Sequence, residues 1–370
     1  MKVLIVDDSV VFRMALSTGL TNVSGVKIVG TASNGQLALD FLKNHKDVDL
    51  MILDMEMPVL NGIETIRAIR KVNKKIIIIV FSSLTLNGAE LTLEALDLGA
   101  NDFVTKQEAS SAINLEESLK MIEATLVPKM KAFKNVLNKG RHQVCYSPKK
   151  TVENKPISVN IVGTDDLVLD VKNCLRQMNE PPKLILIASS TGGPDALATV
   201  FEEISERARV PILLVQHMPP LFTKKLAELL NKKCQHLTIK EAMEGESLKA
   251  GTCYIAPGDY HMTVSRSLNI QLNQDSKVSF VRPSATVLFD SIIRNYMDKT
   301  LTIVLTGMGD DGALGIEKLV KRGDYAYIQD EATSVVWGMP GAARLKCPSI
   351  KELPLDEISI FLSMIFKETV

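Results

Sequence analysis

Short apolar runs alternate with segments of helical periodicity through the first third of the chain. The apolar runs lie at 3–6, 26–30, 50–53, 76–81 and 102–104, and the helical patterns lie near 9–20, 35–43, 61–70, 88–97 and 111–126. Strands that alternate with helices build parallel sheets, and strands buried on both faces are short and continuously apolar. The pattern therefore predicts a doubly wound, five-stranded parallel sheet in an α/β domain over residues 1–126.

Acidic and polar side chains follow the strands of this predicted sheet. Asp7 and Asp8 follow the first run, Asp54 the third, Ser82 the fourth and Lys106 the fifth. The carboxyl ends of parallel strands share one edge, so we expect these side chains to converge there. Three carboxylates at one crevice repel one another unless a hard cation offsets their charge, and Mg²⁺ held through oxygen suits that role. A carboxylate beside Mg²⁺ can accept a phosphoryl group, a hydroxyl can hold it and a lysine can balance its charge.

Residues 1–126 resemble a response-regulator receiver domain. The resemblance rests on the acidic pair, on Asp54 followed by Met57, Pro58 and Gly62, and on the stretch from Asp102 to Lys106. It implies that Asp54 is the phosphoacceptor and that Mg²⁺ is held by Asp8, Asp54 and the backbone carbonyl of Glu56, with Asp7 nearby. It also implies a histidine kinase as the phosphodonor, and phosphate contact and switch roles for Ser82, Lys106 and Phe103.

One position departs from the receiver pattern. Gln107 follows Lys106 where the family commonly has a proline joined through a cis bond. A cis bond to a residue other than proline costs about 3 kcal/mol, so we expect a trans bond here.

A serine, a histidine and a carboxylate follow three apolar runs in the second half of the chain. The run at 184–188 leads into Ser190, the run at 211–216 into His217, and the run at 301–305 into a loop with Asp310 and Asp311. A histidine can take the serine proton as general base, and an aspartate can orient the imidazole and stabilise its charged form. The pattern predicts acyl transfer to water, although the spacing alone does not choose between the two aspartates.

Residues 183–370 are similar to the catalytic domain of the chemotaxis protein-glutamate methylesterases. The matching stretches are Ser190–Gly193, Gln216–Pro219, Ile255–Gly258, Thr306–Gly309 with Asp311 and Gly312, Gln329–Glu331 and Val336–Ala342. The resemblance implies an α/β hydrolase-type domain with a mostly parallel sheet. It implies Ser190 as nucleophile, His217 as base and Asp311 as orienting acid, with backbone support for the oxyanion from Thr191 and Met308.

The same resemblance implies the reaction. The substrates would be γ-glutamyl methyl esters on the cytoplasmic helices of chemoreceptors, with glutamine deamidation as a second activity and no cofactor in the hydrolase domain. Phosphorylation of Asp54 would shift Ser82 and Phe103 and loosen a receiver that lies over the hydrolase cleft. The alternative is a phosphorylation-responsive binding module, or a phosphate sink, that has the hydrolase fold but no hydrolysis.

Two positions depart from the methylesterase pattern. Ala188 and Ser189 stand where glycine and alanine are usual, and we expect this change to stiffen the turn. Ala285 and Thr286 follow Pro283 and Ser284 where an acidic residue is usual. We expect the second change to affect substrate contacts without touching the triad.

Residues 127–182 are predicted to form a partly ordered linker between the two domains. Prolines mark both of its ends, as is typical of linkers. Its middle leaves an alternative open, because 157–162 alternates like a strand and 167–178 is compatible with a helix, so this piece could pack on a domain. We interpret the basic residues from Lys129 to Arg141 as the solvated face of a helix that continues from residue 120.

Charge and cysteine usage exclude several classes of partner. Lysine plus arginine and aspartate plus glutamate both total 43, so no global field draws the chain to nucleic acid or to a membrane. No apolar stretch approaches the roughly 18 residues of a membrane span, and no export-signal pattern is present. Five cysteines lie without paired spacing, which favours reduced thiols. We therefore expect a cytoplasmic protein with no nucleic-acid partner and no direct membrane insertion.

Overall fold

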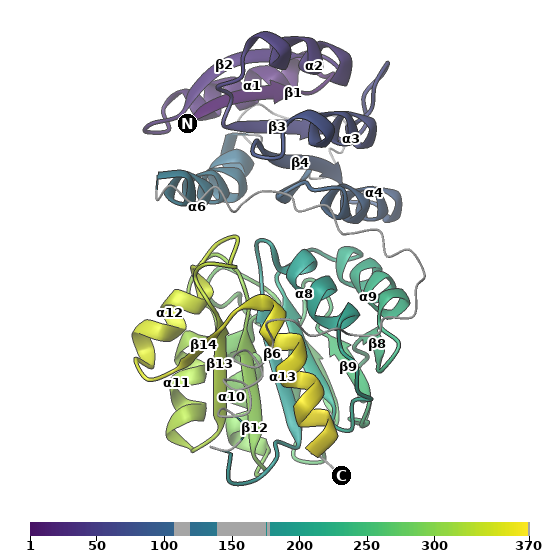
Figure 1. Cartoon of the computed structure of the whole chain (residues 1–370), viewed down its shortest axis with the longest axis vertical. Helices are drawn as coiled ribbons and strands as arrows, with labels where there is room; N and C mark the ends of the chain where they lie inside the picture. Colours follow the sequence, from purple (N-terminus) through teal and green to yellow (C-terminus); the bar gives the residue numbers. More distant parts are fainter. Residues whose placement is uncertain (107–118, 139–174, 176–177, 369–370) are drawn as a thin grey trace, which may run out of the picture. The chain divides into compact units, whose positions relative to one another are not determined.

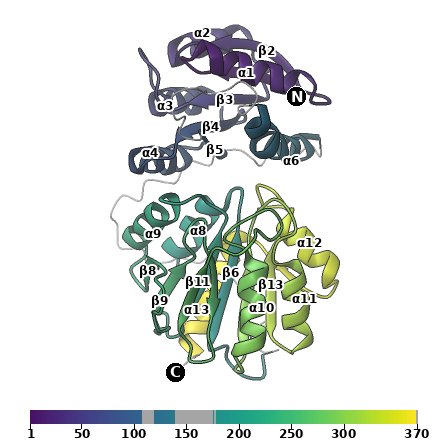
Figure 2. The ribbon, with the colours of Figure 1, turned by 180° about the vertical axis from the view of Figure 1, so that it is seen from behind.

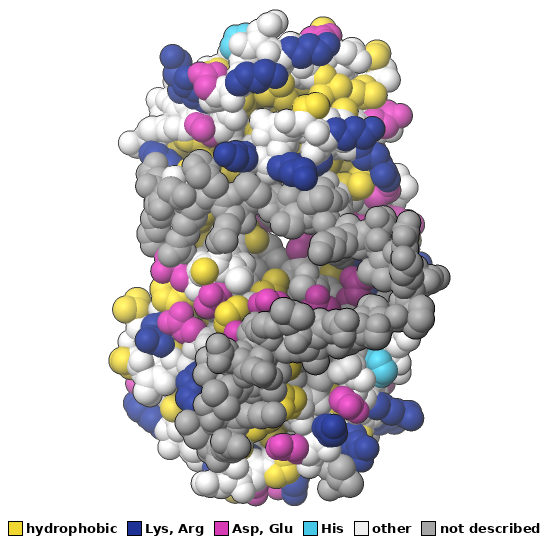
Figure 3. All heavy atoms as spheres, viewed as in Figure 1, with side chains coloured by type: hydrophobic (Ala, Val, Ile, Leu, Met, Phe, Trp, Pro, Cys, Tyr) yellow, Lys and Arg dark blue, Asp and Glu magenta, His cyan; other side chains and the backbone are white. Residues whose placement is uncertain are grey.

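The computed structural model describes residues 1–106, 119–138, 175 and 178–368. These residues form two compact units, each with its own sheet (Figure 1, Figure 2). Basic and acidic side chains both occupy the face seen in Figure 3, in keeping with a formal net charge of zero. No helix in the described part of the chain is long and apolar enough to cross a membrane.

The N-terminal unit contains the predicted five-stranded parallel sheet. Its strand order is β2-β1-β3-β4-β5, and every neighbouring pair is parallel. The strands are β1 (Lys2–Val6), β2 (Lys27–Ala32), β3 (Leu50–Asp54), β4 (Ile77–Ser83) and β5 (Asp102–Lys106). The strand that follows β1 in the chain, β2, lies on one side of β1, and β3 lies on its other side. The crevice beyond the carboxyl ends of β1 and β3 is therefore the switch point where ligands collect in such sheets.

Helices cover both faces of this sheet. They are α1 (Val10–Thr21), α2 (Gly35–Asn44), α3 (Gly62–Val72), α4 (Leu86–Asp97), the short π-helix η1 (Ile122–Leu126) and α6 (Val127–Asn138). Along the sheet α2 contacts α3 and α3 contacts α4, whereas α1 contacts η1. Local signals begin these helices: Asn61 and Glu64 form a reciprocal capping box at the start of α3, with distances of 2.9 and 3.0 Å.

The helix that we expected to continue from residue 120 is present as η1 and α6. Met130 and Phe133 of α6 are fully buried. The predicted solvated face does not hold for Lys129. Its side chain is partly buried, and its ammonium lies 2.7 Å from a carboxylate oxygen of Asp102. The predicted strand at 157–162 lies outside the described residues, as does nearly all of the predicted helix at 167–178.

The C-terminal unit is built on a seven-stranded parallel sheet with the order β14-β13-β12-β6-β7-β9-β8. The strands are β6 (Leu184–Ser189), β7 (Ile212–Gln216), β8 (Thr238–Glu241), β9 (Thr252–Ile255), β12 (Thr300–Val304), β13 (Tyr325–Gln329) and β14 (Lys351–Leu353). An antiparallel pair, β10 (His261–Val264) and β11 (Ile270–Asn273), forms a separate two-stranded sheet. The predicted mostly parallel sheet is therefore confirmed.

Helices lie on both faces of this second sheet as well. They are α8 (Gly193–Glu202), α9 (Phe222–Lys233), α10 (Ala285–Asn295), α11 (Ala313–Lys321), α12 (Met339–Lys346) and α13 (Leu355–Glu368). Figure 1 shows α8 and α13, which contact each other, in front of the sheet, and Figure 2 shows α10 and α11 on the other side. Apolar side chains from β6, β7 and β12, which include Leu186, Leu213 and Val304, are fully buried in the core between these layers.

The strand order explains where the predicted catalytic residues gather. β6 lies in the middle of the sheet, with β7 on one side and β12 on the other. Since all three strands run in the same direction, the loops after them meet at one edge. We call this edge the catalytic rim; it is formed by Ser190, His217 and the loop from Thr306 to Gly312.

Candidate active site and acidic cluster

Three carboxylates gather at the carboxyl ends of β1 and β3. Oxygen atoms of Asp7, Asp8 and Asp54 all lie within 4.8 Å of one another. Asp7 and Asp54 are almost fully buried, whereas Asp8 is exposed. The ammonium of Lys106 lies 2.9 Å from Asp7 Oδ2 and 2.9 Å from Asp54 Oδ1. One lysine cannot balance three carboxylates, and a set of oxygen donors with an exposed member fits a divalent cation such as Mg²⁺.

The charge on Asp54 is energetically costly in this cluster. Burial raises the pKa of Asp54 to about 6, and Asp7 adds to the rise while Lys106 opposes it. Burial opposes the charge of Lys106 too, but Asp54 and Asp7 outweigh it and raise the pKa of the ammonium. A divalent cation bound among these carboxylates would remove part of this cost.

The other predicted receiver residues lie on the neighbouring strands. Ser82, at the end of β4, is buried, and its hydroxyl donates to the Gly88 carbonyl at 2.9 Å. Phe103 lies on β5, with the Lys129 ammonium 5.8 Å from its ring centroid. The backbone N–H of Glu56 donates to Asp54 Oδ1 at 3.5 Å. The trans bond expected before Gln107 lies outside the described residues.

Ser190 and His217 follow two strands that are paired in register. Ser189 at the end of β6 is opposite Gln216 at the end of β7. The residues that follow them, Ser190 and His217, are therefore neighbours, because adjacent strands lie about 4.8 Å apart. The His217 N–H donates to the Ser189 carbonyl at 3.1 Å, and the Ser190 N–H donates to the Thr306 carbonyl at 3.0 Å. In the described part of the chain no hydrogen bond joins Ser190 Oγ to the His217 ring.

The structure distinguishes Asp311 from Asp310. The Nε2 atom of His217 lies 2.9 Å from Asp311 Oδ2, and Asp311 is 2% exposed. Asp310 is exposed instead. Because Nε2 faces the carboxylate, Nδ1 is the ring nitrogen left to accept a proton.

The N-terminus of α10 holds the Asp311 carboxylate. Ser284 Oγ donates to Oδ1 at 2.7 Å, the Ala285 N–H to Oδ2 at 2.6 Å, and the Thr286 N–H to Oδ1 at 3.1 Å. Burial alone would favour the neutral acid, but hydrogen bonds and charge from His217, with Ser284 and Thr286, lower the pKa of Asp311 to about 2. Asp311 is therefore ionised at neutral pH, and its carboxylate faces the His217 ring.

The departure at Ala285 and Thr286 reaches the loop of the acid through one side chain. Both residues donate to Asp311 through backbone N–H groups, which any residue would supply, whereas the Thr286 hydroxyl accepts from the Gly312 N–H at 2.8 Å. The reason is that α10 begins directly beside the Asp311 loop. The Thr286 side chain thus supports the loop that carries the acid.

Gln216 and Ser189 are site residues whose roles the sequence analysis missed. Ser189 Oγ donates to Gln216 Oε1 at 2.7 Å, and Gln216 Nε2 donates to the carbonyls of Ser190 and His217 at 3.0 and 3.3 Å. A Cβ at Gly193 would lie only 2.0 Å from Gln216 Oε1, so the amide needs a glycine there. These contacts tie the strand end of the nucleophile to that of the base. A serine and a glutamine at the ends of apolar runs were the signal that could have revealed them.

The loop after β12 approaches Ser190 closely. A Cβ at Gly307 would lie 2.9 Å from Ser190 Cβ, which no side chain could tolerate. The Met308 N–H has no acceptor among the described residues. Thr191 lies between Ser190 and the first turn of α8, where helix N–H groups and the helix dipole favour negative charge. Donors are therefore available beside the serine for a developing oxyanion.

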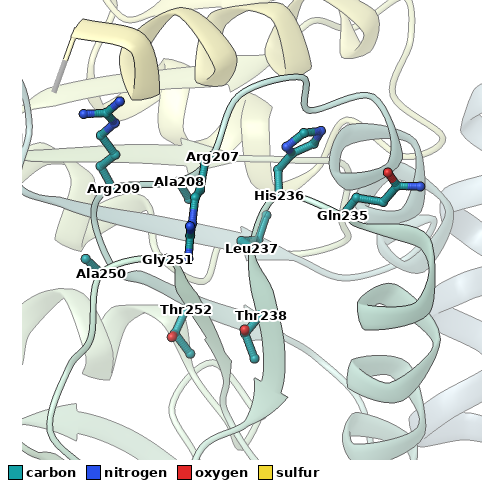
Figure 4. A pocket seen from close by; sticks show the side chains of 10 residues that line it. All are labelled: Arg207, Ala208, Arg209, Gln235, His236, Leu237, Thr238, Ala250, Gly251 and Thr252. Atoms are coloured by element: carbon teal, nitrogen blue, oxygen red, sulfur yellow. The ribbon is translucent and has the colours of Figure 1, made fainter. Parts of the chain in front are cut away.

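A cavity of about 600 Å³ lies at the opposite edge of the sheet, where β8 and β9 begin (Figure 4). It is lined by Arg207, Ala208, Arg209, Gln235, His236, Leu237, Thr238, Ala250, Gly251 and Thr252. None of the predicted site residues lines it.

The fold and these two sites define a class of protein in which a receiver-type domain precedes an α/β hydrolase domain. The description "Response regulator receiver domain" matches residues 3–116, and "CheB methylesterase" matches residues 185–362. Both halves thus match known families in the order that the motifs indicated.

Relatives match nearly the whole chain. A protein-glutamate methylesterase/protein-glutamine glutaminase from Trichodesmium erythraeum is 36% identical over 362 residues, which cover 97% of each chain. One from Nocardioides sp. is 37% identical over 364 residues, covering 96% of this chain and 93% of the relative. The crystal structure of the Thermotoga maritima CheB methylesterase catalytic domain covers 50% of this chain and 100% of its own, with 36% identity and a TM-score of 0.47.

The chain belongs to the CheB family of chemotaxis methylesterases with a receiver domain. The family resemblance drawn from the motifs is confirmed, as is the fold class of both domains.

Proposed function

We propose that this protein is a phosphorylation-activated hydrolase that removes methyl esters from glutamate side chains of chemoreceptors. On receptor glutamines it acts as a deamidase, and both activities serve adaptation in bacterial chemotaxis. The observation that carries the hydrolase assignment is the contact between His217 and an ionised Asp311. His217 follows β7, which pairs with the strand that leads into Ser190. Among the described residues, nothing favours the alternative of a binding module without hydrolysis.

The reaction follows from the placement of these groups. Ser190 Oγ attacks the ester carbonyl while His217 takes the hydroxyl proton at Nδ1, because Nε2 is engaged by Asp311. Negative charge on the carbonyl oxygen meets the Met308 N–H and the backbone of Thr191 at the start of α8. As the acyl-enzyme forms, the imidazolium returns the proton to the leaving methoxide, which departs as methanol.

Water completes the cycle. His217 removes a proton from the water as it attacks the acyl-enzyme, and then returns that proton to Ser190 Oγ as glutamate is released. With a glutamine substrate the departing group of the first step is ammonia. Throughout, Asp311 stays ionised and keeps the imidazole in the orientation that presents Nδ1 to the serine.

The acidic cluster supplies control. Asp54 is the proposed phosphoacceptor, a histidine kinase of the chemotaxis array is the phosphodonor, and Lys106 and Ser82 contact the new phosphate. Asp8, Asp54 and the Glu56 carbonyl would hold Mg²⁺, with Asp7 nearby, and the ion would offset the charge that gathers during transfer. For Ser82 to reach a phosphate it must release the Gly88 carbonyl, and together with a movement of Phe103 this change is proposed to relieve inhibition of the hydrolase. We place the protein in the cytoplasm, with methylated receptor helices as substrate, no nucleic-acid partner and no insertion into the membrane.

Methanol release from methylated receptor membranes tests the assignment. Ser190→Ala should lower the rate on the order of 10⁴-fold while the domain stays folded, because the nucleophile is removed. If the wild-type and Ser190→Ala proteins released methanol at the same rate, the hydrolase assignment would be wrong and the binding-module alternative would take its place.

A further inference from the structure

A two-residue hairpin turn in the C-terminal unit presents a fully exposed aromatic side chain. Val278 and Val281 exchange backbone hydrogen bonds of 3.2 and 3.0 Å around Ser279 and Phe280. Both central residues have positive φ, 49° and 64°, as a type I′ turn requires. Such turns favour Asn-Gly, and a bulky side chain is unfavourable at positive φ. Phe280 is nevertheless 95% exposed and buries nothing that could offset this cost.

The base of this turn is firmly held. The Arg282 guanidinium lies 3.0 and 2.6 Å from Asp259 Oδ1 and donates to the carbonyls of Gln274 and Asp275 at 2.6 and 2.7 Å. The Asp259 N–H donates to the Arg282 carbonyl at 3.1 Å. The strained turn is therefore positioned by its surroundings, so that Phe280 projects from a rigid support.

The hairpin is continuous with the catalytic rim. Pro283 and Ser284 follow it directly, and Ser284 Oγ donates to Asp311. Asp259, to which Arg282 binds, lies in the loop after β9, and β9 ends at the same edge of the sheet as β7. Tyr260, next in that loop, is 39% exposed. Two exposed aromatic side chains thus stand on loops that the Arg282–Asp259 ion pair joins, and one of these loops leads into the serine that contacts Asp311.

We propose that the Val278–Val281 hairpin docks the receptor helix, with Phe280 packing against apolar side chains that flank the target glutamyl ester. This inference rests on the proposed function, which makes a helix surface the substrate. A single ester side chain offers little binding area, and aromatic anchors dominate the energy of protein interfaces. An aromatic residue that is kept at an unfavourable backbone conformation, rigidly supported, and four residues before the serine that donates to the catalytic acid fits such an anchor.

Two measurements on the full-length protein test this docking. The first is hydrolysis of methylated receptor membranes, with turnover of p-nitrophenyl acetate as a readout of the triad without docking. Phe280→Gly should raise KM for receptor about tenfold or more, with kcat and the small-ester rate unchanged. Its thermal stability should stay the same or rise, because glycine accepts positive φ. The second is co-sedimentation with receptor membranes, in which the Ser190→Ala, Phe280→Gly double variant should need about tenfold more membrane for half-maximal binding than Ser190→Ala.

Two control variants separate docking from general effects. Ser279→Asn relieves the turn and keeps the aromatic ring, so it should retain the wild-type KM. Met297→Ala removes a side chain that is 91% exposed but precedes β12 at the opposite edge of the sheet, and it should also leave KM unchanged.

Three results would overturn the docking inference. Unchanged co-sedimentation of the double variant would show that the receptor does not contact Phe280. An equal loss of small-ester turnover in Phe280→Gly would assign the residue to the support of the triad. A rise in the small-ester rate of the unphosphorylated Phe280→Gly protein would assign the hairpin to contact with the chain's own receiver. Failure of the proposed function gives a different result, because wild-type protein would then release no methanol even where co-sedimentation depends on Phe280.

Discussion

Asp311 Oδ2 lies 2.9 Å from Nε2 of His217, which leaves Nδ1 as the ring nitrogen available to Ser190. In the proposed reaction this relationship sets the roles of all three residues, because the tautomer with a proton on Nε2 has its lone pair on Nδ1. The carboxylate keeps that proton in place and becomes the counter-charge when the ring is protonated.

Asp311→Asn should lower methanol release about 10³- to 10⁴-fold. An amide can present its NH₂ group to Nε2, which stabilises the wrong tautomer and removes the counter-charge. The rate is measured on methylated receptor membranes, with circular dichroism to confirm folding. Asp310→Asn is the matched control, since Asp310 is the exposed neighbour, and it should keep wild-type activity. Equal losses in the two variants would contradict the role of Asp311.

The same carboxylate should make stability depend on pH in an acidic window. Hydrogen bonds lower the pKa of Asp311 from 3.8 to about 2 in the folded protein, so the folded state favours the ionised form. The resulting stabilisation, about 2 kcal/mol, is present above about pH 4 and is lost as the pH falls through about 2. The free energy of unfolding of the wild type minus that of Asp311→Asn, measured with urea, should shrink from pH 5 to pH 2. A difference that is constant over this range would show that the pKa is not lowered.

The sequence predicted the rim but not the contacts within it. Apolar runs identified the strands that carry Ser190 and His217, and parallel pairing then placed both residues at one edge. The choice of ring nitrogen could not be predicted, because it depends on where α10 begins. That helix starts at Ala285, which is 26 residues before Asp311 along the chain, and only tertiary packing brings them together.

The receiver half shows the same division. Strand ends predicted the convergence of Asp7, Asp8 and Asp54. The engagement of the Ser82 hydroxyl by the Gly88 carbonyl was not predictable, because it depends on how the first turn of α4 packs against the end of β4. Side-chain rotamers and helix placement, which no local pattern encodes, account for what was missed.

Asp54→Asn should abolish stimulation by a small phosphodonor such as acetyl phosphate. The amide cannot form the acyl phosphate, so the hydrolase would stay at its unstimulated rate. Small-ester turnover with and without the phosphodonor measures the effect. Asp40→Asn, at an exposed carboxylate on α2, is the control and should respond like the wild type. Stimulation that persists in Asp54→Asn would place the phosphoacceptor elsewhere.

Removal of divalent cations should impair phosphorylation of the receiver domain without affecting the unstimulated hydrolase. EDTA should prevent phosphorylation of Asp54, because three carboxylates and one lysine leave the site too negative for a phosphodonor. Small-ester turnover by the unphosphorylated protein should be unchanged, since the proposed reaction of the triad uses no metal ion. Added Mg²⁺ should restore phosphorylation, measured by incorporation of labelled phosphate. A loss of the unstimulated ester rate in EDTA would contradict this division.

Ser189→Ala should destabilise the catalytic rim through Gln216. The serine hydroxyl is the donor that Gln216 Oε1 accepts at 2.7 Å, and both side chains are at most 1% exposed. Without the hydroxyl a buried acceptor loses its partner, at a cost of about 1–3 kcal/mol in the free energy of unfolding. The amide also loses the contact that directs Nε2 to the carbonyls of Ser190 and His217, so kcat should fall more than KM changes. Ser267→Ala, at an exposed serine, should alter neither quantity. If Ser189→Ala matched this control in both urea unfolding and kcat, the hydroxyl would have no part in aligning the two strand ends.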